Sequence, residues 1–438
     1  MRVNLKSIKI ISYLWIGTLL GAILNFASQA ILARNLGTEH FGSWSTALTV
    51  IATITPLAGF GISNFWLRIF GKEGWRAIRW LPASLTTIFL STMIAFGCVA
   101  MWAVFTTPNT EARTPLLILS GLLLGSISID MASTKLQLEE KFLQMALWQL
   151  LPPALKFFGI LLLIYASDSL LNLTKLSWLF SGISIGVALL LYLQLREFFH
   201  GQIDLVGHEK QPTYLLLQSD DGKVGVRQIL KKSWAFGTAN FFHLIYFQGS
   251  ILALKHLMGD AQAGLFSAAL IAISAIYIFP TVVYNKFLYP KIHRLANQNT
   301  NELHRIFIYG SKYMLGIGSV SAIALAIAAP YVLPILFGND FSAAIPILQI
   351  LTLAIPLRFA STGVGAMLLT EQHMLAKVGV MGSVAVMSVF LNLCLIDDFG
   401  IMGAAYATIT SEFLLLLLYW LSVKRLVFRK ISIKNESN

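Results

Sequence analysis

The stretch from Ala33 to Leu48, ARNLGTEHFGSWSTAL, joins two long apolar segments and occurs again in modified form 222 positions later. Over the twelve positions that begin at Gly37, five residues are identical in the second copy. They include both glycines, since Gly37 and Gly42 correspond to Gly259 and Gly264. Each copy lies between two apolar runs of membrane-spanning length. A hairpin used twice, half a chain apart, predicts a membrane protein built from two equivalent halves.

The composition supports a membrane protein. Of 438 residues, 56% are hydrophobic and only 12% are charged, about half the share that is usual for a soluble domain. The net charge of +12 does not indicate nucleic-acid binding, because the basic residues lie at the ends of apolar runs and form no patch of their own. The two cysteines, Cys98 and Cys394, both lie within apolar runs and define neither a disulfide framework nor a metal site.

Twelve apolar runs are long enough to cross the hydrocarbon core, which takes about 20 residues of helix. Placing the N-terminus in the cytoplasm puts 26 of the 32 basic residues on the cytoplasmic side and four outside, a strong positive-inside pattern. Both termini are then cytoplasmic, and we expect the two longest runs to contain a kink or an interfacial stretch. The runs are 10–33, 41–67, 80–105, 114–134, 142–167, 176–195, 233–254, 261–285, 313–339, 341–370, 378–396 and 399–423. The first run is too long for the apolar core of a secretory signal.

The longest hydrophilic stretch lies at the middle of the chain, between the sixth and seventh runs. We therefore expect an N-terminal six-helix bundle over residues 1–200, a cytoplasmic connector over 201–228, and a C-terminal six-helix bundle with a short basic tail over 229–438. An even number of spans in each half makes the two copies parallel, related by an axis along the membrane normal.

Polar residues within the apolar runs are the candidate functional residues, because charge at bilayer depth is costly and usually faces a cavity. Basic side chains that face such a cavity would attract an anionic substrate, and guanidinium groups bind phosphate through paired hydrogen bonds. Interfacial anchoring, snorkelling and packing are the competing interpretations for several of them. The candidate substrate-binding residues are Arg34, Arg68, Lys156, Arg358, Asn25 and Gln29. The candidates for coupling or charge balance are Asp130, Glu412 and His243.

Several functional classes lack support in the sequence. There is no phosphate-binding G-x-x-x-x-G-K-[ST] loop, no H-E-x-x-H motif and no cysteine pair for zinc. We therefore expect a transporter without a cofactor rather than an enzyme or a pump, coupled to a proton or to sodium, if at all. A cation-coupled small-molecule exporter and a membrane glycosyltransferase or ligase stay as alternatives. The exporter would need buried acids, and the transferase would need long outer loops that carry acids or histidines.

Short motifs occur along nearly the whole chain: Ala33–Gly37 with Phe41-Gly42, Gly59 to Arg68, Gly259 with Gly264–Ala269, Pro290–Ile292, Leu336–Phe341, and Leu391-Asn392 with Gly400–Thr408. They resemble those of the bacterial polysaccharide and O-antigen flippases of the Wzx type. That family belongs to a superfamily with the multidrug and toxin extrusion proteins and the lipid II flippases. In one departure, many relatives have an Asp in the seventh span where this chain has Ser250.

The resemblance implies two six-helix bundles around a V-shaped cavity. It also implies that undecaprenyl-diphosphate-linked oligosaccharide moves from the cytoplasmic to the periplasmic leaflet of a bacterial inner membrane, for O-antigen, exopolysaccharide or capsule synthesis. The expected partners are the lipid-linked substrate and the bilayer, together with the polymerase and chain-length proteins of the same pathway. We expect a monomer that binds no nucleic acid.

Overall fold

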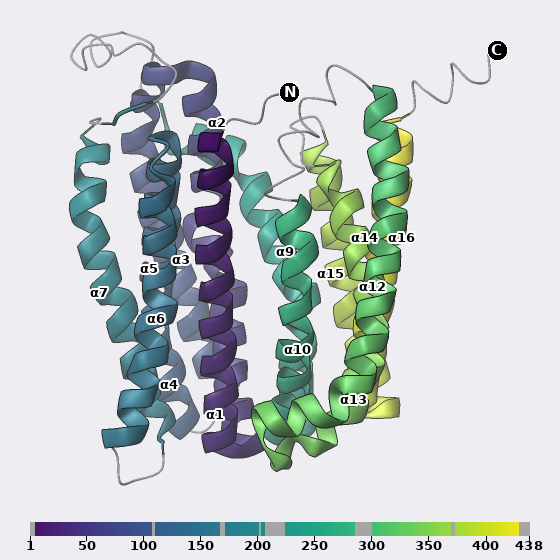
Figure 1. Cartoon of the computed structure of the whole chain (residues 1–438). Coiled ribbons are helices and arrows are strands. Elements are labelled where there is room, and N and C mark those ends of the chain that lie inside the picture. Colours follow the sequence, from purple (N-terminus) through teal and green to yellow (C-terminus); the bar gives the residue numbers. More distant parts are fainter. Residues whose placement is uncertain are drawn as a thin grey trace, which may run out of the picture. The chain divides into compact units, whose positions relative to one another are not determined.

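A computed structural model describes residues 5–106, 110–166, 171–200, 203–205, 224–284, 300–368 and 373–428. All regular elements in these ranges are helices, as the apolar composition predicts (Figure 1). The helices are α1 (Leu5–Gly59), α2 (Ile62–Glu73), η1 (Gly74–Trp80), α3 (Leu81–Thr106), α4 (Thr110–Leu119), α5 (Leu122–Leu138), α6 (Phe142–Ala166), α7 (Leu173–Phe199), α9 (Val226–Met258), α10 (Asp260–Thr281), α12 (Thr300–Phe337), η3 (Asn339–Ala344), α13 (Ile345–Leu351), α14 (Ala354–Ala366), α15 (Met374–Phe399) and α16 (Ile401–Leu426).

The chain forms two compact units. Unit 1 contains Met1–Gln29 and Ala47–Phe241, and unit 2 contains Ala30–Thr46 and Phe242–Asn438. Two helices are shared: α1 passes from unit 1 into unit 2 and back, and α9 begins in unit 1 and ends in unit 2. Most of the expected connector at 201–228, and the motif at 290–292, lie outside the described residues.

Several apolar segments are long enough to cross a membrane. Within the described ranges there are eight, or nine if one bent pair counts as a span. The first, Ile16–Thr106, has 91 residues and includes α1 to α3. As helix it would be roughly 135 Å long against a hydrocarbon core of about 30 Å, so it holds more than one crossing. The protein is therefore a multi-pass membrane protein, while the expected total of twelve spans stays a prediction.

Several of the expected spans are broken helices. The run at 341–370 divides into Asn339–Leu351 and Ala354–Ala366, which are bent by 52°. Pro356 in the first turn of α14 cannot donate the backbone bond that would continue α13, which confirms the expected kink. The run at 41–67 is also among the longest, and it too contains a break. It is interrupted where Phe60 and Gly61 both have positive φ, 43° and 73°.

Small residues bring the helices of unit 1 together. Helices α5, α6 and α7 pack side by side (Figure 1). A methyl group added at Gly125 of α5 would lie 2.7 Å from the Cβ atom of Ser184 in α7. Helix α7 also has two glycines four residues apart, Gly182 and Gly186. A methyl group added at either of them would have no atom within 4 Å. The small face that α7 presents to α5 is therefore its serines, not its glycines.

A charged cluster fastens the α5–α6 turn to α7. Lys135, whose side chain is only 7% exposed, donates to the Gln194 carbonyl at 3.1 Å and lies 3.7 Å from Glu139 and 3.8 Å from Glu197. Glu139 also pairs with Lys141 at 2.9 Å. This hydrogen bond raises the pKa of Lys141. The cluster lies at the edge of the apolar segments, where the sequence placed its lysines.

The repeated hairpins contact each other inside unit 2. Gly37 and Gly259 both break the helix with nearly the same dihedrals, φ 70° and ψ 176° against φ 91° and ψ 177°. These values are almost restricted to glycine. A methyl group at Gly42 would lie 1.8 Å from the Asp260 carbonyl oxygen, and one at Gly264 would lie 2.1 Å from the Thr38 carbonyl oxygen. Since 38 and 260 are themselves equivalent positions, the contact is reciprocal, and the repeat is structural as well as sequential.

Candidate functional site

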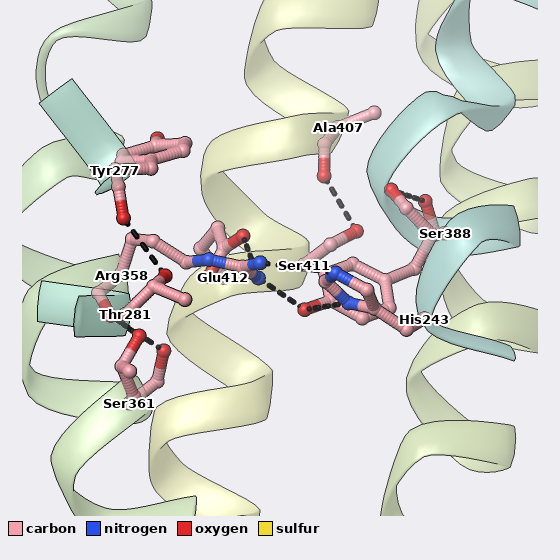
Figure 2. A network of polar contacts seen from close by, with 11 residues as sticks. His243, Tyr277, Thr281, Arg358, Ser361, Ser388, Ala407, Ser411 and Glu412 are labelled. Atoms are coloured by element: carbon pink, nitrogen blue, oxygen red, sulfur yellow. Dashed lines mark hydrogen bonds and ion pairs between the residues drawn. The ribbon is translucent and has the colours of Figure 1, made fainter. Parts of the chain in front are cut away.

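The central feature of unit 2 is the buried ion pair between Arg358 and Glu412. Arg358 lies on α14, two residues beyond Pro356, and its Nη1 atom is 3.2 Å from the Oε1 atom of Glu412 on α16. The side chains are 15% and 2% exposed, respectively. Figure 2 shows the guanidinium group directed between α16 and α9. A charge at this depth needs a partner, and Glu412 supplies it.

Helix α9 completes the coordination of the guanidinium group. Arg358 also donates to the hydroxyl group of Tyr246, and its Nη2 atom lies 3.1 Å from Nε2 of His243 (Figure 2). Because a guanidinium group only donates, Nε2 must accept, and the proton of a neutral imidazole is then on Nδ1. That nitrogen lies 2.9 Å from the Tyr246 hydroxyl oxygen, so it donates there. The three side chains form one connected network with Glu412.

Aromatic rings surround the same cation. The Cζ atom of Arg358 is 5.9 Å, 5.2 Å and 5.6 Å from the ring centroids of Tyr246, Phe247 and Tyr277. Phe247 also stacks on the imidazole of His243, with centroids 5.8 Å apart. A ring face attracts a cation by about 1–2 kcal/mol once water is removed. These rings therefore stabilise the charge without neutralising it.

Local hydrogen bonds fix the backbone around the ion pair. Ser361 and Thr362 donate to the carbonyl oxygen of Arg358 at 3.1 Å and 2.8 Å, and Ser411 donates to that of Ala407 at 2.7 Å (Figure 2). Such bonds within a helix satisfy hydroxyl groups that have no water to bind. The helices thus hold the charged side chains between them at fixed positions.

Ser250, the residue at which the chain departs from the family pattern that it resembles, is fully buried, and its hydroxyl group lies 3.2 Å from that of Thr408. Nearby, Ser388 donates to the carbonyl oxygen of Tyr246 at 3.4 Å. This contact between α9, α15 and α16 is neutral. The carboxyl group of the Arg358 network is supplied by Glu412 on α16, and not by α9.

Arg34 belongs to unit 2 but lies outside the network. Its guanidinium group donates to the carbonyl oxygen of Pro334 at 3.4 Å and to that of Ile335, near the end of α12. The last carbonyl groups of a helix have no partner within the helix. Arg34 therefore caps the C-terminal end of α12, a contact that the sequence did not suggest.

The other predicted residues lie in unit 1. Asn25 and Asp130 are exposed, and Arg68 is exposed on α2. Gln29 is half-buried, and its Oε1 atom has no hydrogen-bond partner among the described residues. Lys156 on α6 lies with its Nζ atom 5.0 Å from the ring centroid of Phe180 on α7.

The predicted site residues of unit 1 do not form a connected polar network as those of unit 2 do. Within its described residues, no hydrogen bond or ion pair links Asn25, Gln29, Asp130 or Lys156 to one another. By contrast, three of the predicted residues, His243, Arg358 and Glu412, meet in unit 2.

Sequence reasoning missed the aromatic members of the network. Tyr246 and Phe247 follow His243 by three and four residues, so they share its helix face. That spacing was a usable signal. Tyr277 lies on another helix, and nothing in the linear sequence connects it with Arg358.

Comparison with known proteins identifies the family. The family model described as "Polysaccharide biosynthesis protein" matches residues 7–296. No curated protein matches the sequence.

Among solved structures, the lipid II flippase MurJ in an inward closed conformation superposes with a TM-score of 0.68 at 14% identity, over 94% of this chain and 87% of that one. An outward-facing multidrug resistance MATE family transporter of the MOP superfamily gives 0.64 at 14% identity, over 95% of each chain. A MOP superfamily transporter from Pyrococcus furiosus gives 0.63 at 15% identity, over 95% of this chain and 96% of that one. The fold is thus that of MOP superfamily transporters, and the chain belongs to the polysaccharide biosynthesis protein family.

Proposed function

We propose that this protein is a flippase that moves undecaprenyl-diphosphate-linked oligosaccharide across a bacterial cytoplasmic membrane by alternating access. The observation that carries the proposal is a guanidinium group kept charged inside an apolar unit of a polysaccharide biosynthesis family protein. The likeness to a lipid II flippase supports a lipid-linked substrate. Twelve spans with both termini in the cytoplasm, and a place in O-antigen, exopolysaccharide or capsule synthesis, belong to the same proposal.

Arg358 has capacity left for an anion. A guanidinium group has five N–H donors. Three of them point to Glu412, Tyr246 and His243, and the other two have no hydrogen-bond partner among the described residues. A diphosphate oxygen could take these two in the paired geometry that Arg favours. Arg68, Lys156, Asn25 and Gln29, which lie in unit 1, belong to the same proposal as candidate substrate-binding residues.

Glu412 supplies a way to couple binding to a proton. The carboxylate balances the positive charge that a diphosphate would bind, so protonation of Glu412 would strengthen the attraction of Arg358 for the substrate. Its Oε2 atom is buried and has no hydrogen-bond partner among the described residues, which leaves room for the proton. His243, which contacts Arg358, belongs to the same proposal as a second group that balances charge. Asp130 is exposed and lies in unit 1, so it takes no part in this ion pair.

Export of an organic cation is the competing function, because MATE transporters share the fold. The sign of the buried charge discriminates between the two. Glu412 could attract a cation only if Arg358 moved away, and the guanidinium group is held by three side chains and three rings. The network therefore favours an anionic substrate.

The test is reconstitution of the full chain into liposomes that contain an undecaprenyl-diphosphate-linked oligosaccharide. Translocation is measured as loss of access to an external glycosidase. Arg358→Ala should lower the rate about tenfold or more, because a hydrogen bond to a charged group is worth about 1.5–3 kcal/mol. Arg305→Ala, an exposed arginine at the start of α12, is the matched control. An unchanged rate in Arg358→Ala would contradict the assignment, and efflux of organic cations without glycolipid movement would favour the exporter.

A further inference from the structure

An apolar groove outside the ion-pair network lies between α12 and α16, with α14 as its floor. Its volume is about 350 Å³. The lining is apolar apart from Ser311 and Lys312 and contains no acidic residue. Leu315, Phe413 and Leu417 form part of its walls, and all are at least partly exposed.

One end of the groove is basic and aromatic. Lys312 is the last charged residue of α12, since the 25 residues from Tyr313 to Phe337 carry no charge. Trp420, which lines the groove from α16, is 42% exposed and has the Nζ atom of Lys424 5.2 Å from its ring centroid.

The two lysines lie toward the same end of unit 2. Phe428, just beyond α16, packs on His304 and Phe307 in the first turns of α12, with ring centroids 4.7 Å and 5.4 Å apart. The C-terminal end of α16 therefore adjoins the N-terminal end of α12. Tryptophan and lysine are typical of the level where hydrocarbon meets lipid headgroups.

We propose that this groove binds an anionic phospholipid of the surrounding membrane. One acyl chain lies against Leu315 and Phe413, and the phosphate group is held by Lys312 and Lys424. Trp420 packs at the junction of chain and headgroup. The site does not depend on the flippase assignment, because it needs only a membrane with anionic lipid.

The charges, rather than the apolar walls, give this site its selectivity. A lipid tail gains little by leaving other tails for leucine side chains, since both environments are equally apolar. A lysine near the membrane surface, in contrast, attracts an anionic headgroup. The groove should therefore discriminate by headgroup charge and not by chain length.

The test uses the purified full-length protein in a neutral detergent and measures retained lipid by native mass spectrometry. Phosphatidylglycerol and phosphatidylcholine with identical chains are the probes. Wild-type protein should prefer phosphatidylglycerol at least about tenfold, and Lys312→Gln and Lys424→Gln should each weaken its binding about fivefold. Lys231→Gln, an exposed lysine at the start of α9 in unit 1, is the matched control and should change nothing. Melting temperatures without lipid establish that each variant is folded.

Three results would overturn the proposal. The first is equal retention of the two phospholipids by the wild-type protein. The second is an undiminished preference in the Lys312→Gln/Lys424→Gln double variant. The third is displacement of phosphatidylglycerol by an equal concentration of undecaprenyl phosphate, in the wild-type protein but not in the double variant, since that would assign the groove to the substrate lipid.

Discussion

Removing one partner of the Arg358–Glu412 pair should destabilise unit 2 far more than removing both. Glu412 is 2% exposed, so Arg358→Met leaves a buried carboxylate without its cation, and Glu412→Leu leaves a buried cation. Breaking such a pair costs about 3–5 kcal/mol, whereas replacing both charges by apolar residues is often neutral. The cost of Glu412→Leu should be at the lower end of this range, about 3 kcal/mol. The reason is that Tyr246 and His243 still accept hydrogen bonds from the guanidinium group. The Coulomb term agrees, at roughly 4 kcal/mol for charges about 4 Å apart at an effective dielectric of 20.

The assay is thermal unfolding of the full chain in detergent. In a unit of roughly 200 residues, 1 kcal/mol moves Tm by about 2–4 °C, so each single variant should lose roughly 6–20 °C. The double variant should recover most of this loss. Asp260→Asn is the control, because the Lys255–Asp260 pair in the same unit is shorter, 2.6 Å, but 19% and 29% exposed. It should cost at most about 1 kcal/mol.

Two outcomes would refute this reasoning. One is a Glu412→Leu variant no less stable than Asp260→Asn. The other is a double variant whose loss equals the sum of the single losses, since additivity means that the two charges do not interact. A double variant that folds yet cannot move glycolipid would separate the structural role of Arg358 from its proposed role in binding substrate.

Four further substitutions test a close helix contact, a helix cap and a buried charge cluster. Gly264→Ala places a methyl group 2.1 Å from the Thr38 carbonyl oxygen and should cost about 1–3 kcal/mol in thermal unfolding, whereas Gly182→Ala, with no atom within 4 Å, should be neutral or slightly stabilising. Arg34→Ala removes the cap of α12 and should cost about 1 kcal/mol, and an unchanged Tm would show that the contact contributes nothing. Glu139→Gln should cost about 3 kcal/mol, because its carboxylate is 3% exposed and faces two lysines, and a loss that disappears in high salt would mean that the cluster is solvated.

The features that could be predicted from the sequence are those set by local composition. Apolar runs give the helices and their membrane character. The glycine spacing gives the two corners, because Gly37 and Gly259 adopt dihedrals that almost only glycine tolerates. The kink in the run at 341–370 follows from Pro356, which lacks a backbone donor.

Contacts between distant residues could not be predicted in this way. Arg358 and Glu412 were each identified by depth, but their pairing across 54 residues depends on how α14 packs against α16. Arg34 looked like a ligand because it is a cation at the end of a span, yet it binds helix-end carbonyl groups 300 residues away. The helix boundaries explain that difference, since a C-terminal end needs donors that the linear sequence does not name.

The repeated halves are alike in backbone and unlike in charge, and this difference bears on coupling. At the corners, Gly42 and Gly264 make reciprocal contacts, so the two copies serve the same structural purpose. Lys156 in unit 1 lies on an aromatic ring and has no ion pair among the described residues, whereas Arg358 in unit 2 shares its charge with Glu412. Protonation of Glu412 would change the net charge of the Arg358–Glu412 pair. The contact of Lys156 with its aromatic ring contains no carboxylate that a proton could neutralise. If a proton drives the protein, its effect on anion binding should therefore arise at the Arg358–Glu412 pair in unit 2.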